Sequence, residues 1–214
     1  MTRWDRYRKD KIKVIGILDI ETHGFGFNAN ESYMICWGLR QFNLETKKSK
    51  TYYNILDKET LKFWNRKMKH DKRLEKIRPY DTQILPSLVK TMKECDLIVT
   101  QYGTYFDIPF IRSRCEILRI PFLNHTDKIK FVDTWRFARY GLKLKRNSLD
   151  NISRTLRIND TKTEFNLQKW VLDGVYGDKK ELRVVLKHNL KDVNITDKVW
   201  RKLEHSFPIP TRYY

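Results

Sequence analysis

An apolar segment near the N-terminus, VIGILDIET (residues 14–22), carries two carboxylates, Asp19 and Glu21, one residue apart. Residues 12–21 are rich in β-branched side chains and too few for a lone core helix, so they predict a central β-strand. Side chains alternate between the faces of a strand, so Asp19 and Glu21 share a face with the apolar Ile17. Such a pair stays ionised only beside cations or several hydrogen-bond donors. It therefore indicates either a salt-bridge cluster with Lys and Arg or a metal site.

The rest of the chain predicts a mixed sheet flanked by helices. Strands at 32–42 and 49–56 extend the first strand into an antiparallel meander, and two shorter strands, DLIVTQ and FVDTW, follow later. Asp81 and Thr82 offer an N-cap for a helix that runs to about Cys95. Further helices are expected from near Asp107, over residues 148–158, and from about 179 to 204. This order, in which strands come first, strands and helices then alternate, and helices come last, indicates an α/β fold.

The charge of the chain favours nucleic acid as a partner. The formal net charge is +18, and a charge of this size is usually offset by an anionic partner. An anionic membrane surface is a weaker candidate, and a composition that simply favours lysine is the alternative to both. No apolar stretch approaches the roughly 20 residues that span a bilayer. Three widely spaced cysteines without a C-x-x-C pair indicate reduced thiols and no structural zinc site.

One domain is expected, because no linker-like or repetitive tract divides the chain. Residues 1–11 predict a basic N-terminal arm, and 12–214 predict the domain itself. Residues of about 57–80 form a basic insertion, which could be a solvated helical excursion or an arm facing phosphates. No signal-type segment follows the N-terminus, so the expected location is the cytoplasm, or the host cytoplasm for a virus-encoded protein.

Two further acidic positions complete a candidate site. Asp107 lies at a strand–loop–helix junction in YGTYFDIPFI, where alone it would be expected to cap the helix. Asp192 lies in the C-terminal helix with His188 four residues before it, on the same helical face. Alone, such a pair is usually a local hydrogen bond. Together with Asp19 and Glu21, however, these acids could hold two Mg²⁺ or Mn²⁺ ions, which prefer carboxylate oxygens.

The segments LDIET, YGTYFDIPFI and HNLKD resemble the three exonuclease motifs of the DnaQ-like (DEDD) 3′–5′ exonucleases, which have the RNase H-like fold. The resemblance covers roughly residues 12–204 and includes VDTWRFAR and NSLDNISRTLRI. Among the branches, the YprB-type predicted ribonuclease H-like exonucleases and the proofreading domains of family B polymerases are the most similar. The resemblance implies that two Mg²⁺ or Mn²⁺ ions are held by Asp19, Glu21, Asp107 and Asp192.

The resemblance also implies substrate contacts, with two departures from the family pattern. Thr22 is expected near the terminal nucleotide, and Phe106 and Lys162 are further substrate-binding candidates. The family's second motif commonly has Asn four or five residues before its Asp, where this chain has Gly103 and Tyr102; Tyr102 could instead stack on a base. The third motif combines the His of one subgroup with the spacing of another. His188 is therefore either a general base or a residue that orients Asp192.

The expected function is removal of nucleotides from the 3′ end of a nucleic acid, releasing nucleoside monophosphates. The expected substrate is a single strand with a free 3′ end, with DNA favoured over RNA. One alternative is the same fold acting as an endonuclease, on junctions or RNA–DNA hybrids. Another is a binding subunit with vestigial catalysis. A third is a proofreading part that works with a separate polymerase or another replication or repair protein.

Overall fold

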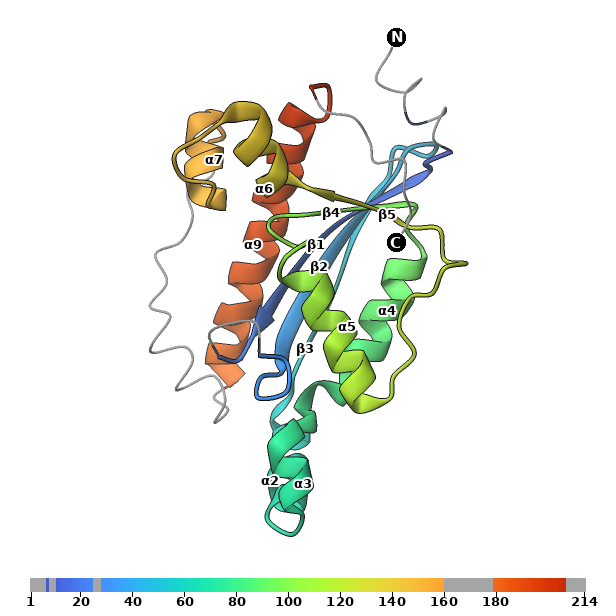
Figure 1. Ribbon diagram of the computed structural model, residues 1–214, viewed down its shortest axis with the longest axis vertical. Helices are drawn as coiled ribbons and strands as arrows, with labels where there is room; N and C mark the ends of the chain where they lie inside the picture. Colours follow the sequence, from blue (N-terminus) through green and yellow to red (C-terminus); the bar gives the residue numbers. More distant parts are fainter. Residues whose placement is uncertain (1–6, 8–10, 25–27, 160–178, 207–214) are drawn as a thin grey trace.

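A five-stranded mixed sheet forms the centre of the computed structural model, which describes residues 7, 11–24, 28–159 and 179–206 (Figure 1). The strand order is β3-β2-β1-β4-β5. The strands are β1 (Val14–Thr22), β2 (Met34–Asn43), β3 (Ser49–Ile55), β4 (Leu97–Thr100) and β5 (Lys130–Asp133). The helices are α2 (Lys58–Met68), α3 (Lys72–Ile77), η1 (Pro79–Gln83), α4 (Leu85–Lys93), α5 (Asp107–Leu118), α6 (Thr134–Arg136), the π-helix η2 (Phe137–Leu142), α7 (Leu149–Thr155) and α9 (Lys179–Leu203).

The pairing of the strands confirms the predicted mixed sheet. β1, β2 and β3 form an antiparallel meander, whereas β4 pairs in parallel with both β1 and β5. The two parallel strands are short and completely or largely buried. This is the RNase H-like arrangement expected from the sequence: an antiparallel meander extended by parallel strands and flanked by helices.

The two faces of the sheet are covered by different helices, and β1 contributes to both cores. Ile15 and Ile17 pack with Val193 and Trp200 of α9 on one face. Leu18 and Ile20 join the larger core under α4 and α5 on the other face. Figure 1 shows α9 on one side of the sheet and α4 and α5 on the opposite side. The alternation therefore directs Asp19 and Glu21 toward α9, as the strand pattern predicts.

Gly38 in β2 allows α9 to approach the sheet closely. A Cβ atom at this position would lie 2.5 Å from the Asn189 Oδ1 atom and 2.9 Å from the Leu190 Cδ2 atom. Those separations are too short for any side chain larger than hydrogen. The absence of a side chain at Gly38 thus sets how near α9 comes to the C-terminal half of β1.

The predicted N-cap at Asp81 is wrong. Asp81 lies in η1, is fully buried, and forms an ion pair with the equally buried Arg114 of α5 at 2.6 Å. α4 instead begins at Leu85, and Ile84 precedes it without a side-chain cap. The local spacing is that of a helix cap, but the buried guanidinium of Arg114, more than 30 residues away, requires a carboxylate partner. The tertiary ion pair with Arg114 therefore determines the position of Asp81.

Several other predicted segments have the expected form. Ser148 caps α7 by accepting a hydrogen bond from the Asn151 amide, and the basic insertion is helical, forming α2 and α3. Most of the predicted N-terminal arm, and Lys162, lie outside the described residues. Among the helices that are described, none combines the length and the apolar character required to span a membrane.

Candidate active site

His188 of α9 lies between two carboxylates that come from different elements. Its Nε2 atom is 3.9 Å from Glu21 Oε1 on β1 and 3.7 Å from Asp192 Oδ2 on the next turn of α9. All three side chains are largely buried, at 17% exposure or less. The helical spacing thus brings His188 and Asp192 to the same face of α9. That face lies against the C-terminal half of β1, which carries Asp19 and Glu21.

Asp19 is held by Asn189, the residue after His188. The Asn189 Nδ2 atom donates a hydrogen bond to Asp19 Oδ2 at 2.8 Å, and Asn189 is fully buried. Its Oδ1 atom faces Gly38 and accepts no hydrogen bond from the residues that the structure describes. Sequence reasoning missed Asn189, although it lies inside the HNLKD segment. The sequence shows only that Asn189 follows His188. No local pattern indicates that its side-chain amide is buried rather than exposed.

Asp107, the first residue of α5, reaches β1 from the other side. Its buried carboxylate interacts with the Ile20 backbone amide, and Ile20 lies between Asp19 and Glu21 in the sequence. β1 and β4 pair only as far as Ile17 and Val99, so the edge of β1 is open to α5 beyond that point. Burial, reinforced by the nearby Asp133 charge, raises the pKa of Asp107 to about 7.

Asp133, the last residue of β5, fixes the loop that leads into α5. Its carboxylate accepts hydrogen bonds from the amides of Tyr102 at 2.8 Å, Thr104 at 3.0 Å and Trp135 at 2.9 Å. Two of these donors belong to the loop between β4 and α5, where Tyr102 has a left-handed φ of 65°. Asp133 was quoted in VDTWRFAR but not singled out, because its role depends on a loop about 30 residues away.

Four aromatic rings form a cluster over this loop. Tyr102, Tyr105 and Trp135 lie with their ring centroids 5.2 to 5.4 Å apart, and Tyr140 lies 6.4 Å from Trp135. Tyr105 and Tyr140 are 41% and 64% exposed. We call these four residues the aromatic cluster. Tyr102 was a sequence candidate, whereas Trp135 and Tyr140 were found only in the structure.

The two other described substrate candidates are in less open positions. Thr22 ends β1 after an irregularity in the pairing with β2 and is buried. Phe106 is half-buried, packs against the core under α4 and α5, and has its ring 5.8 Å from that of Phe110. Phe106 therefore contributes to the packing that positions its neighbour Asp107.

The donor chemistry of this region fits hard divalent cations. Asp19, Glu21 and Asp192 line the α9 side of β1, and Asp107 approaches from α5. Carboxylate oxygens are the ligands that Mg²⁺ and Mn²⁺ prefer. Within the described ranges, however, three or more Asp, Glu, His or Cys side chains do not stand in a ready-made metal-binding group. The acids instead engage the protein donors that lie beside them.

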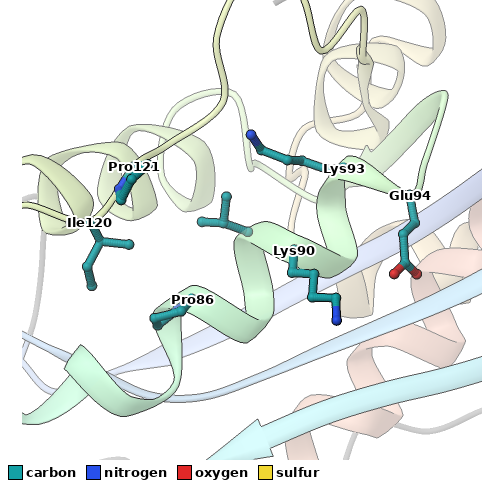
Figure 2. A pocket seen from close by; sticks show the side chains of 7 residues that line it. Pro86, Lys90, Lys93, Glu94, Ile120 and Pro121 are labelled. Atoms are coloured by element: carbon teal, nitrogen blue, oxygen red, sulfur yellow. The ribbon is translucent and has the colours of Figure 1, made fainter.

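A separate hollow lies on the outer side of α4 (Figure 2). It has a volume of about 490 Å³ and lies between α4 and the Ile120–Pro121 segment. Lys93 at its rim pairs with Asp127 at 3.4 Å, and Glu94 accepts a hydrogen bond from Gln41. This hollow is on the opposite face of the sheet from His188 and is not part of the candidate active site.

A family model of the RNase H superfamily matches residues 17–204, which include all four candidate acids and His188. The chain belongs to the RNase H superfamily. Among solved structures, this RNase H superfamily member is similar to the family B DNA polymerase of the hyperthermophilic archaeon Pyrobaculum calidifontis. The TM-score is 0.65 at 13% sequence identity, over 90% of this chain and 24% of the polymerase, so the likeness is one of fold. No curated protein sequence matches the chain.

Proposed function

We propose that this protein is a DEDD-type, metal-dependent 3′–5′ exonuclease that hydrolyses phosphodiester bonds and releases nucleoside monophosphates. The observation that carries the proposal is the approach of acids from two other elements, α9 and α5, to the two acids in the C-terminal half of β1. Asp192 shares His188 with Glu21, and Asp107 lies at the Ile20 amide. An isolated structural salt bridge would require none of this convergence.

Asp19, Glu21, Asp107 and Asp192 would hold a pair of Mg²⁺ or Mn²⁺ ions. When bound, such ions lower the pKa of a coordinated water and stabilise the charge on the leaving oxygen. The burial of Asp107 supports this role. Burial makes the charged carboxylate unfavourable in the metal-free protein, which raises its pKa, and a bound cation would offset that cost. Ion binding would exchange the present contacts of Asp19 and Glu21 with Asn189 and His188 for metal coordination.

His188 would accept a proton from the attacking water or orient Asp192. Its Nε2 atom lies within 4 Å of Glu21 and Asp192, so the imidazole stands beside two of the acids that would hold the ions. Asn189 would hold Asp19 in position, and Asp133 would hold the loop before Asp107. Both are positioning residues.

The similarity to a family B DNA polymerase and the motif resemblance together support the DnaQ-like, YprB-type or proofreading-domain assignment within the superfamily. We infer that residues 12–214 form the nuclease domain, with residues 57–80 as a basic insertion. The aromatic cluster supports a substrate with unpaired bases, since exposed rings beside a nuclease site can stack on them. Thr22 and Lys162 stay as proposed substrate contacts, and a separate polymerase or repair protein stays as a proposed partner.

Matched DNA and RNA oligonucleotides labelled at the 5′ end test this function in the presence of Mn²⁺. The proposal predicts a ladder of products that shortens progressively from the 3′ end, and no cleavage in excess EDTA. A single internal product would instead support the endonuclease alternative. Binding without turnover, together with an Asp19→Ala variant that behaves like the wild type, would support a vestigial binding subunit.

A further inference from the structure

The insertion between β3 and α4 forms a helical hairpin rich in positive charge. We define residues 57–78, which contain α2 and α3, as the basic hairpin. Its 22 residues include nine Lys and Arg against four Asp and Glu. Figure 1 shows α2 and α3 projecting past the end of β3. The hairpin is not part of the five-stranded sheet. The positive charge of the hairpin therefore requires an explanation other than the formation of the sheet.

The basic hairpin is anchored firmly at its base. Leu61 of α2 is buried, and the half-buried Trp64 packs against the core under α4 and α5. The Tyr80 hydroxyl donates to Asn65 Oδ1, and Gln83 Nε2 donates to Asp57 Oδ2 at 3.1 Å. Packing and hydrogen bonds from η1 thus hold one face of the hairpin against the body of the protein.

Arg114 links the base of the basic hairpin to the helix that carries Asp107. Its guanidinium donates to the carbonyl oxygens of Ile77 and Arg78, each at 2.9 Å, and pairs with Asp81 in η1. A fourth contact reaches the Ala29 carbonyl in the connection between β1 and β2. Since Arg114 and Asp107 belong to the same helix, the hairpin is fixed relative to the candidate active site.

The sheet register places the root of the basic hairpin near the carboxylates. Glu21 of β1 pairs with Cys36 of β2, and Cys36 pairs with Ile55 of β3, two residues before Asp57. Neighbouring strands lie about 4.8 Å apart, so Ile55 is roughly 10 Å from Glu21 across the sheet. The hairpin therefore leaves the sheet at the same end as the candidate active site.

The exposed face of the basic hairpin combines unneutralised charge with an aromatic side chain. Lys62 and Arg73 pair with Glu59 and Asp71. Phe63 is 44% exposed, and the Lys67 ammonium lies 5.7 Å from its ring centroid. The other exposed basic residues are Lys58, Arg66, Lys69, Lys72 and Lys76. Cations interspersed with an exposed aromatic ring are typical of surfaces that bind a nucleic-acid backbone.

We propose that the basic hairpin binds the phosphodiester backbone of the nucleic acid whose 3′ end enters the candidate active site. This inference rests on the proposed function. α2 has 11 residues and is about 16 Å long, so the hairpin extends from roughly 10 to 26 Å from Glu21. For a strand whose nucleotides are stacked at the spacing of about 3.4 Å found within one strand of B-DNA, this reach corresponds to phosphates about three to eight nucleotides from the terminus.

The test compares two triple variants that each remove three positive charges. Arg66→Gln/Lys67→Gln/Lys69→Gln removes three of the positive charges on the exposed face of the basic hairpin. The control, Lys47→Gln/Lys48→Gln/Lys50→Gln, neutralises exposed lysines at the opposite end of the sheet, where Ser49 pairs with Phe42. All six positions are exposed, so neither variant disturbs the core. Binding of a fluorescein-labelled oligonucleotide of about 20 residues is measured in EDTA over a range of salt concentrations.

The hairpin variant is expected to bind at least tenfold more weakly than the control variant. Its plot of log affinity against log salt is expected to be shallower by roughly 2 to 3, since each lost phosphate contact contributes about 0.7 to 0.9. Equal affinities and slopes for the two variants would overturn the proposal. A matching loss of affinity for poly-glutamate would also overturn it, because the surface would then attract any polyanion.

Two further readouts separate this inference from the proposed function. Hydrolysis of the p-nitrophenyl ester of thymidine 5′-monophosphate, which is too small to reach the hairpin, should be equal in the wild type and the hairpin variant. A trinucleotide should likewise be bound equally by both. A wild-type chain that binds long oligonucleotides through the hairpin but hydrolyses nothing would refute the exonuclease and leave this inference supported. A hairpin variant that loses hydrolysis of the small ester would overturn the inference.

Discussion

The side-chain amide of Asn189 donates a hydrogen bond to the carboxylate of Asp19 at 2.8 Å, although the two residues are 170 positions apart. This bond joins the first strand of the sheet to the last described helix. It lies beside Gly38, which permits the close approach. The relative position of the acids on β1 and α9 therefore depends on a residue that is not itself a candidate ligand.

Replacing Asn189 with Ala should reduce nuclease activity by about 10- to 100-fold, as is usual when a residue that orients a metal ligand is removed. The free energy of unfolding should fall by only about 1 to 2 kcal/mol, the cost of one buried hydrogen bond and a small cavity. The control is Asn194→Ala on the same helix, where Asn194 accepts from Arg40 at 3.2 Å. Equal activities of the two variants, at equal stability, would show that Asn189 does not position the site.

Replacing Asp192 with Asn should abolish most nuclease activity, by at least about 100-fold, while leaving oligonucleotide binding nearly unchanged. The substitution keeps the shape of the side chain but removes the charge that a cation requires. Asp197→Asn is a demanding control, because Asp197 is also buried on α9 but pairs with Arg201 at 2.8 Å. It should lose stability rather than catalysis. Steady-state rates and urea denaturation of both variants check this, and an active Asp192→Asn enzyme would contradict it.

The pKa of Asp107 predicts a specific dependence of stability on pH in the metal-free protein. Burial raises this pKa to about 7 in the folded chain, whereas an unfolded chain has a value of about 3.9. The folded state therefore prefers the protonated form, and the stability contributed by Asp107 is complete below about pH 4. It is lost between about pH 4 and 7 and is constant above that range.

Asp107→Asn lacks this titration. As the pH rises from 4.5 to 7.5, the wild type should therefore lose a few kcal/mol of unfolding free energy relative to Asp107→Asn. Urea denaturation in EDTA at both pH values measures it. A pH-independent difference between the two proteins would show that the carboxylate is not desolvated as the structure indicates.

The aromatic cluster predicts a preference for unpaired bases. Trp135→Ala combined with Tyr105→Ala should weaken binding of a single strand by several kcal/mol at most, since stacking on one base contributes about 1 to 3 kcal/mol. Binding of a blunt duplex should change little. The Tyr53→Ala variant on β3 serves as the aromatic control, because Tyr53 is exposed and lies outside both the aromatic cluster and the basic hairpin. A duplex affinity that falls as far as the single-strand affinity would argue against stacking on unpaired bases.

The sequence predicted the parts of this protein that depend on local periodicity. Alternation along β1 placed Asp19 and Glu21 on one face, and that face does meet α9. The spacing of His188 and Asp192 likewise placed both on one face of a helix. These predictions succeed because strand and helix geometry fix the direction of a side chain without reference to the rest of the chain.

The features that the sequence did not predict depend on distant partners. Asp81 has the spacing of a helix cap, but the buried charge of Arg114 holds it in η1. Asp133 orders a loop about 30 residues earlier in the chain, and Asn189 contacts a strand near the N-terminus. Such roles become visible only once the fold brings the partners together, because the residues themselves carry no periodic signal.

The number of Mn²⁺ ions bound per chain tests the central claim most directly. Electron paramagnetic resonance of free Mn²⁺, titrated into the wild type in the presence of a nucleoside monophosphate, should give two bound ions. Asp19→Asn and Asp107→Asn should each bind fewer, while Asp197→Asn should bind the same number as the wild type. Wild-type protein that binds no Mn²⁺, or a stoichiometry unaffected by Asp19→Asn and Asp107→Asn, would contradict the convergence of these acids on a two-metal site.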